Sequence, residues 1–156
     1  MPPEGPIGPE QRALLSPSDP TTYRLKVYQK PPTQNQVKPD TKVVKCRNGN
    51  LLPIAWLRVK NIERAWDKAI PKATERQRAT TRRSLMFTRI MGPRERPYDR
   101  YNLCGGLKVV VDLLVAKGWL LDDNDLNCDE RMPEQRYAKD GEPYPMTVIE
   151  LQDLPA

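Results

Sequence analysis

The sequence predicts an α/β (α+β) domain in which two main helices pack on a mixed β-sheet. Three observations support this fold class: apolar and polar residues alternate between residues 22 and 29, apolar residues follow a helical spacing after Pro53, and a second helical spacing is centred near residue 110. The chain has 156 residues, which is close to one domain at roughly 150 residues per domain. We therefore expect residues 21–156 to fold as one domain.

The N-terminal part divides into a tail and a strand. Residues 1–20 contain six prolines and little apolar sequence, which predicts a disordered Pro-rich tail. After it, Tyr23, Leu25 and Val27 alternate with polar residues. This pattern predicts a half-buried strand over residues 22–29, which a proline pair ends.

The middle of the chain contains a predicted amphipathic helix. Between residues 33 and 53, two short apolar pairs flank an Asn-Gly dipeptide, and both a hairpin and an irregular loop fit this pattern. Ile62, Trp66 and Ile70 then recur at helical spacing, while charged residues take the other face. The helix should end before the proline at position 71.

The C-terminal half continues the sheet and supplies the second helix. Apolar residues at helical spacing predict a helix from Leu103 to Lys117, followed by Gly118 in the left-handed conformation that ends many helices. An Asp-Gly dipeptide at 140–141 predicts a turn. Strands are expected at residues 85–90, 119–121 and 146–151, with a further alternating stretch at 126–132.

The composition excludes several classes of function. The chain has no histidine, so it cannot use Ser-His-Asp or Cys-His catalysis, a His-assisted nuclease mechanism or His-ligated zinc. Its three cysteines, Cys46, Cys104 and Cys128, include no C-x-x-C pair, which favours reduced thiols over a disulfide scaffold or a four-cysteine zinc site. Since no signal-like start or long apolar run occurs, we expect a soluble, intracellular protein.

The charges are divided along the chain. Lys and Arg total 26 against 20 Asp and Glu, a net charge of +6. Residues 72–100 hold nine basic and three acidic residues, whereas residues 120–156 hold ten acidic and three basic residues. Arginine suits paired hydrogen bonds to phosphates, so both nucleic-acid binding and a solvated basic surface fit this pattern. The candidate DNA contacts are Arg76, Arg78, Arg82, Arg83, Arg94, Arg96 and Arg100.

Carboxylates and a lysine surround the second predicted helix. Asp99 precedes it, Lys108 and Asp112 lie on it, and Asp122-Asp123 follow it. If the flanking strands are neighbours in a strand-helix-strand unit, these carboxylates converge, and Mg²⁺ or Mn²⁺ would relieve their repulsion. Such a site hydrolyses phosphodiesters without histidine. Simpler roles also fit: a polar turn at the aspartate pair, an i,i+4 ion pair on the helix, and a cap or loop position for Asp99.

The string from Asp99 to Asp123, DRYNLCGGLKVVVDLLVAKGWLLDD, resembles the signature of the RusA family of Holliday junction resolvases, particularly its bacteriophage and prophage members. The family pattern reads D-x-D-N-L, a Gly-Gly insertion, K-x₃-D-x-L-x₃-G, then D-D. A looser similarity extends upstream through residues 82–96 and the proline-rich turn at residues 30–35. The resemblance therefore covers most of the chain loosely and its centre well.

The resemblance implies a homodimeric, Mg²⁺-dependent endodeoxyribonuclease that cuts opposed strands of branched double-stranded DNA in recombination and repair. Mn²⁺ would substitute for Mg²⁺, and no small-molecule cofactor or membrane is implied. The location would be the cytoplasm of a bacterial cell or a phage-infected host. Carried over by position, Asp99, Lys108 and Asp123 are the catalytic residues, and Asp99, Asp122 and Asp123 are the metal ligands.

One position departs from the family pattern. Tyr101 occupies the place of the second aspartate of the D-x-D-N motif, and a phenol with a pKa of about 10 is a poor Mg²⁺ ligand at neutral pH. Either another carboxylate, Asp112 or Asp122, compensates, or water fills the position and activity is low, or the protein binds junctions without cutting them. Tyr98 and Tyr101 fit two roles, stacking on splayed bases or packing within the fold. A small interaction protein without nuclease activity remains a further alternative.

Overall fold

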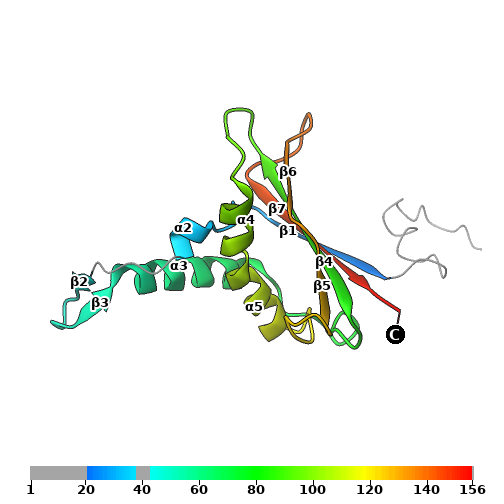
Figure 1. Ribbon diagram of the computed structural model, residues 1–156, viewed down its shortest axis with the longest axis horizontal. Helices are drawn as coiled ribbons and strands as arrows, with labels where there is room; N and C mark the ends of the chain where they lie inside the picture. The colour runs from blue at the N-terminus through cyan, green and yellow to red at the C-terminus, as the bar shows by residue number, and fades with distance from the viewer. Residues whose placement is uncertain (1–20, 38–42, 156) are drawn as a thin grey trace, which may run out of the picture.

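The computed structural model describes residues 21–37 and 43–155, so the tail over residues 1–20 lies outside the described residues. The described chain is a mixed α+β fold built on a five-stranded sheet in the order β1-β7-β4-β5, with β6 also paired to β4 (Figure 1). The strands of this sheet are β1 (Thr22–Val27), β4 (Arg83–Met91), β5 (Cys128–Glu130), β6 (Glu134–Tyr137) and β7 (Met146–Asp153).

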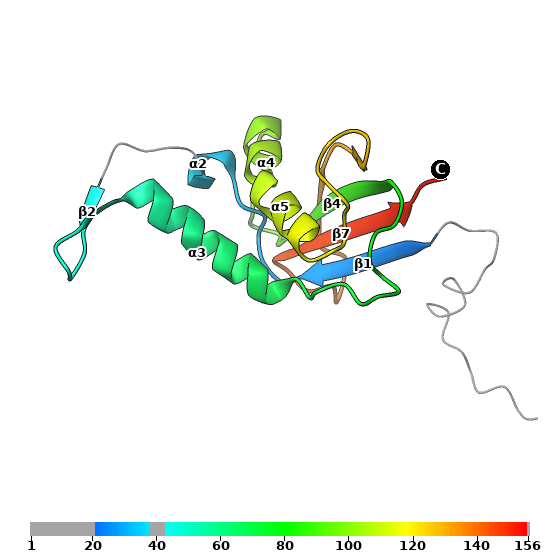
Figure 2. The ribbon, with the colours of Figure 1, turned by 90° about the horizontal axis from the view of Figure 1, so that it is seen from below.

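Helices lie beside the sheet and extend from it. The segments α4 and α5 lie on one side of the sheet, and α3 runs outward to a small hairpin at its far end (Figures 1 and 2). None of the helices in the described part of the chain combines the length and apolar character that crossing a bilayer requires. The bounds are α2 (Gln34–Val37), β2 (Val43–Lys45), β3 (Leu51–Pro53), α3 (Ile54–Ala69), α4 (Arg100–Gly106) and α5 (Lys108–Ala116).

The sheet mixes antiparallel and parallel pairing around β4. Strand β7 pairs antiparallel with both β1 and β4, whereas β5 and β6 pair parallel to β4. Because parallel neighbours need a crossover connection, the chain passes through α4 and α5 between β4 and β5. This crossover is the strand-helix-strand unit on which the expected approach of Lys108 to the aspartates depends.

The core lies between the sheet and the helices. Leu85 and Phe87 of β4 and Ile149 of β7 are buried against Val110 and Leu114 of α5. Seven of the nine residues of β4 are buried, and the two half-buried ones, Met86 and Thr88, lie on the face opposite Leu85 and Phe87.

Several expected elements are present. The alternating segment forms β1, the amphipathic segment forms α3, and the Asn-Gly dipeptide lies between β2 and β3, so the hairpin alternative is confirmed. Gly118 has φ +84° and Gly141 has φ +76°, which confirms the predicted helix end and turn.

The predicted single helix from Leu103 to Lys117 is wrong, because the chain forms α4 and α5 with a break at Leu107. Gly106, the last residue of α4, lies close to the backbone of Pro32: an added Cβ would be 1.7 Å from the carbonyl oxygen of Pro32. The expected strand at 119–121 is also absent, since the amides of Trp119 and Leu120 both donate to the carbonyl of Leu114 and complete the end of α5. The short α2 and β6 were not predicted.

Candidate functional site

Lys108, the first residue of α5, is the centre of the candidate site. Its ammonium group contacts a carboxylate oxygen of Asp123 and lies 3.0 Å from a carboxylate oxygen of Asp112. The Asp123 contact, followed by the Asp112 contact, raises the pKa of Lys108 above its ordinary value, so the lysine is charged throughout the physiological range. Its side chain is 60% exposed, which leaves the charge open to a ligand. We call Lys108, Asp112 and Asp123 the Lys108 centre.

The aspartate pair before β5 forms a hydrogen-bonded turn. The amide of Asp123 donates to one carboxylate oxygen of Asp122 at 2.7 Å, and the side-chain amide of Asn124 donates to the other at 2.9 Å. Lys108 is the main cause of the lowered pKa of Asp123, and Asp122 is the next. The polar-turn interpretation is therefore confirmed, and the same turn presents an ionised Asp123 to Lys108.

Glu130 lies near the Lys108 centre, and the sequence did not identify it as a site residue. It ends β5 and is exposed, and desolvation of its carboxyl by neighbouring atoms raises its pKa; Lys108 lowers that pKa and Asp123 raises it. The glutamate therefore interacts electrostatically with the Lys108 centre. The alternation over residues 126–132 was the available signal, since it placed Glu130 on a strand next to the aspartate turn.

Asp99 lies at the opposite end of α4 from the Lys108 centre. It is the N-cap of α4: its carboxylate accepts hydrogen bonds from the backbone amide of Asn102 at 3.0 Å and from the side-chain amide of Asn102 at 2.6 Å. These bonds lower the pKa of Asp99. Nine residues separate Asp99 from Lys108, which is roughly 13 Å at 1.5 Å per helical residue. The cap interpretation is confirmed.

The structure does not bring the three expected metal ligands, Asp99, Asp122 and Asp123, into one group. Across residues 21–37 and 43–155, no three or more Asp, Glu or Cys side chains are arranged to hold a metal ion. The physical reason is the direction of α4, which begins at Asp99 and carries the chain away from it toward Lys108.

The two tyrosines near Asp99 have different environments. The guanidinium of Arg89 lies 3.6 Å from the centre of the Tyr98 ring, so Tyr98 packs within the fold. Tyr101, in the first turn of α4, is 80% exposed. The packing interpretation is therefore confirmed for Tyr98 and wrong for Tyr101.

The expectation that Arg83 contacts DNA is wrong. Its side chain is 2% exposed, its guanidinium pairs with Asp153 at 2.6 Å, and it donates to the carbonyl of Trp119 at 2.9 Å. A guanidinium enclosed in this way holds β4 to the end of β7 and has no free face for a phosphate. The other six candidate arginines are exposed: Arg76, Arg78, Arg82, Arg94, Arg96 and Arg100.

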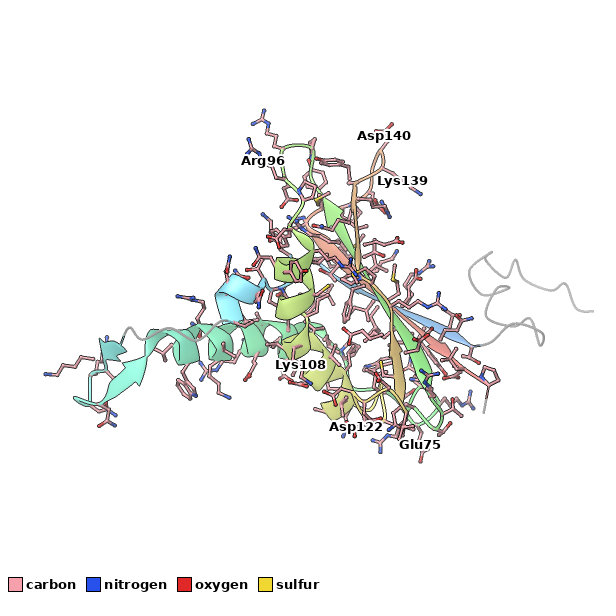
Figure 3. All side chains as sticks on the ribbon, in the orientation of Figure 1. Glu75, Arg96, Lys108, Asp122, Lys139 and Asp140 are labelled. Atoms are coloured by element: carbon pink, nitrogen blue, oxygen red, sulfur yellow. The ribbon has the colours of Figure 1, made fainter. Side chains whose placement is uncertain are left out.

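The exposed arginines fall into two groups at the two ends of β4. Arg76, Arg78 and Arg82 precede the strand, and Arg94, Arg96 and Arg100 follow it. The strand separates the groups by roughly 27 Å at about 3.3 Å per residue. In Figure 3, Glu75 and Asp122 lie together at one end of the molecule, and Arg96 lies at the other. The basic stretch of sequence is thus two surfaces, of which the first lies near the aspartate turn.

No protein-family model matches the chain, and a comparison with curated proteins returns no match. The resemblance to RusA-like resolvases therefore depends on the order and spacing of the motif residues alone.

Proposed function

We propose that this protein is a RusA-like, homodimeric endodeoxyribonuclease that resolves four-way DNA junctions by metal-dependent phosphodiester hydrolysis. The observation that carries the proposal is the contact between Lys108 and Asp123. These residues correspond to two functional positions of the resembled motif, and the crossover from β4 to β5 brings them together. Exposed arginines near the same turn supply positive charge for the DNA backbone.

The residues around Lys108 fit Mg²⁺ as a site with few protein ligands. Mg²⁺ is commonly bound through one or two carboxylates, with water and substrate phosphates as the remaining ligands. Asp122 and Asp123 interact within one turn, and they are the two carboxylates that would hold the ion. When bound, Mg²⁺ or Mn²⁺ supplies a Lewis acid and an activated water.

Lys108 acts on the phosphate directly. Its exposed ammonium would bind a non-bridging oxygen and offset the negative charge that builds up in the transition state. In the free protein, Asp112 and Asp123 hold this ammonium in position. A lysine held at the start of a helix loses less freedom on binding than a mobile one, which favours a defined geometry.

A second candidate function is junction binding without cleavage. Two observations favour it: Asp99 caps α4 away from Asp123, and the exposed side chain at position 101 is a phenol instead of a carboxylate. The DNA-binding arginines would be the same in both functions.

Incubation of the purified protein with a synthetic four-way junction tests the proposal. With Mg²⁺ or Mn²⁺ we expect paired nicks in opposed strands, no nicks with EDTA, and no cutting of a linear duplex of the same sequence. Junction binding without nicks in either metal would support the second candidate. Weak binding that does not change with salt would contradict both, because phosphate contacts make binding steeply salt-dependent.

A further inference from the structure

An open hollow of about 580 Å³ lies between the loop that follows β4 and the turn between β6 and β7. Its lining includes Pro93 of the loop and Tyr137, Lys139 and Tyr144 of the turn region. Small-molecule sites commonly measure roughly 300–1,000 Å³, so the hollow has room for a nucleobase. In Figure 3, Lys139 lies at the same end of the molecule as Arg96 and far from Lys108.

Two aromatic rings at the hollow are exposed and held in place. Tyr137 is 51% exposed and Tyr144 is 53% exposed. The hydroxyl of Tyr137 donates to the carbonyl of Glu95 at 3.3 Å. The ring of Tyr144 covers Gly92, where an added Cβ would lie 2.6 Å from a ring carbon. Exposed rings that are held by a contact with the neighbouring loop form a stacking platform that needs little reorganisation.

The loop on one side of the hollow is braced by a buried arginine. The guanidinium of Arg89 donates to the side chain of Gln135 at 3.0 Å and to the carbonyl of Arg96 at 3.3 Å. The amide of Gly92 donates to Glu95 at 2.7 Å. These hydrogen bonds therefore fix the conformation of the loop that carries Arg94 and Arg96.

The turn on the other side is closed by an ion pair. Arg136 donates to Glu142 at 2.5 and 2.9 Å, and the amide of Lys139 donates to the same carboxylate at 3.1 Å. The Arg136 contact is the largest cause that lowers the pKa of Glu142 to about 2. Glu142 is therefore ionised at neutral pH and engaged in the turn.

The charge around the hollow suits a nucleotide. Arg94 and Arg96 on the loop and Lys139 on the turn are exposed cations. Two carboxylates, Asp140 and Glu142, also line the hollow. Arg136 neutralises Glu142, so the three exposed cations outnumber the one remaining carboxylate, Asp140. Sites that bind single-stranded nucleic acid combine exposed aromatic rings, on which the bases stack, with nearby cations, which bind the phosphates.

We propose that this hollow binds an unpaired nucleotide of branched DNA, with its base stacked on Tyr137 and Tyr144 and its flanking phosphates on Arg94 and Lys139. The inference rests on the proposed function for its branched-DNA substrate, because strands exchange at a junction and bases there can leave the duplex stack. It assigns to this end of the molecule a role separate from the Lys108 centre.

The test uses two DNA probes that contain the fluorescent base 2-aminopurine: a four-way junction with the label beside the exchange point, and a short single-stranded oligonucleotide. Tyr137→Ala removes the ring, Tyr137→Phe keeps the ring without the hydroxyl, and Trp56→Ala removes an exposed aromatic on α3 as a matched control. Circular dichroism confirms that each variant is folded. Binding and quenching of the label are measured for each.

We expect the wild type and Tyr137→Phe to bind both probes and quench the label. Tyr137→Ala should bind the single strand at least about fivefold more weakly, the lower limit for the loss of one base stack, and Trp56→Ala should match the wild type. Equal binding and quenching by wild type and Tyr137→Ala would overturn the inference and leave the proposed function standing. Single-strand binding that requires the Tyr137 ring, without preference for the junction, would support the hollow and overturn junction resolution.

Discussion

The ammonium group of Lys108 contacts a carboxylate oxygen of Asp123, fifteen residues further along the chain. Lys108 begins α5, and Asp123 lies in the turn that leads into β5. The contact lies within the α4–α5 crossover that joins β4 to the parallel strand β5. This geometry makes Asp123 the residue whose replacement tests the proposed chemistry most directly.

Asp123→Asn should lower metal-dependent junction cleavage by roughly 10- to 100-fold or more, because it removes a carboxylate that would hold the metal ion, and even residues that only support metal ligands contribute on this scale. Junction affinity without metal should stay the same or increase, since a negative charge is removed. Asp125→Asn is the matched control, because it removes an exposed carboxylate from the same turn outside the Lys108 centre. Undiminished cutting by Asp123→Asn would remove Asp123 from the mechanism.

Arg76→Ala should weaken DNA binding without changing the melting temperature. Arg76 is exposed in the segment between α3 and β4. Loss of one phosphate contact should reduce the slope of log K against log salt by about 1. Binding titrations at several salt concentrations provide the measurement, and an unchanged slope would show that this arginine does not contact the backbone.

Asp153→Ala should lower the free energy of unfolding by roughly 3 kcal/mol, because the enclosed guanidinium of Arg83 would lose its counter-charge. Glu150→Ala on the same strand is the control. Its partner Arg24 is exposed, so the loss should be below about 1 kcal/mol. Urea unfolding measures both variants, and equal losses would show that the Arg83 pair contributes no more than a surface pair.

Asp99→Ala should destabilise the protein by about 1 kcal/mol, whereas Asp99→Asn should have little effect, since asparagine is an equally good N-cap. The reason is the pair of hydrogen bonds from Asn102 that Asp99 accepts. Thermal unfolding measures the difference. If Asp99→Asn is as unstable as Asp99→Ala, the carboxylate charge matters more than the cap geometry.

Gly106→Ala should destabilise the protein by roughly 3 kcal/mol or more, the upper range for overpacking, because its Cβ would overlap the backbone carbonyl of Pro32. Gly105→Ala is the control. Its Cβ would lie 2.8 Å from the Cβ of Gln34 on the exposed helix α2, a smaller overlap than that at Gly106, so a smaller displacement relieves it. Denaturant unfolding should therefore rank Gly106→Ala as the more damaging change, and the reverse ranking would contradict the close approach.

Local sequence patterns correctly predicted the elements whose conformation does not depend on contacts with distant parts of the chain. Alternation in β1 and the helical spacing in α3 follow from which side chains can be buried, and Gly118 and Gly141 follow from backbone conformations that only glycine adopts readily. The order of residues also predicted that Lys108 and Asp123 lie near one another, and their side chains are in contact.

Contacts between residues far apart in the sequence decided the features that the local patterns did not predict. The need for glycine at position 106 comes from the backbone of Pro32, more than seventy residues away in the sequence, and the burial of Arg83 depends on Asp153 at the end of β7. A run of basic residues gives no sign of which members face the core, since burial depends on contacts made after the strands pair. For the same reason the chain order could indicate that Asp99 and Asp123 belong to one motif, while only the path of α4 decided how far apart they lie.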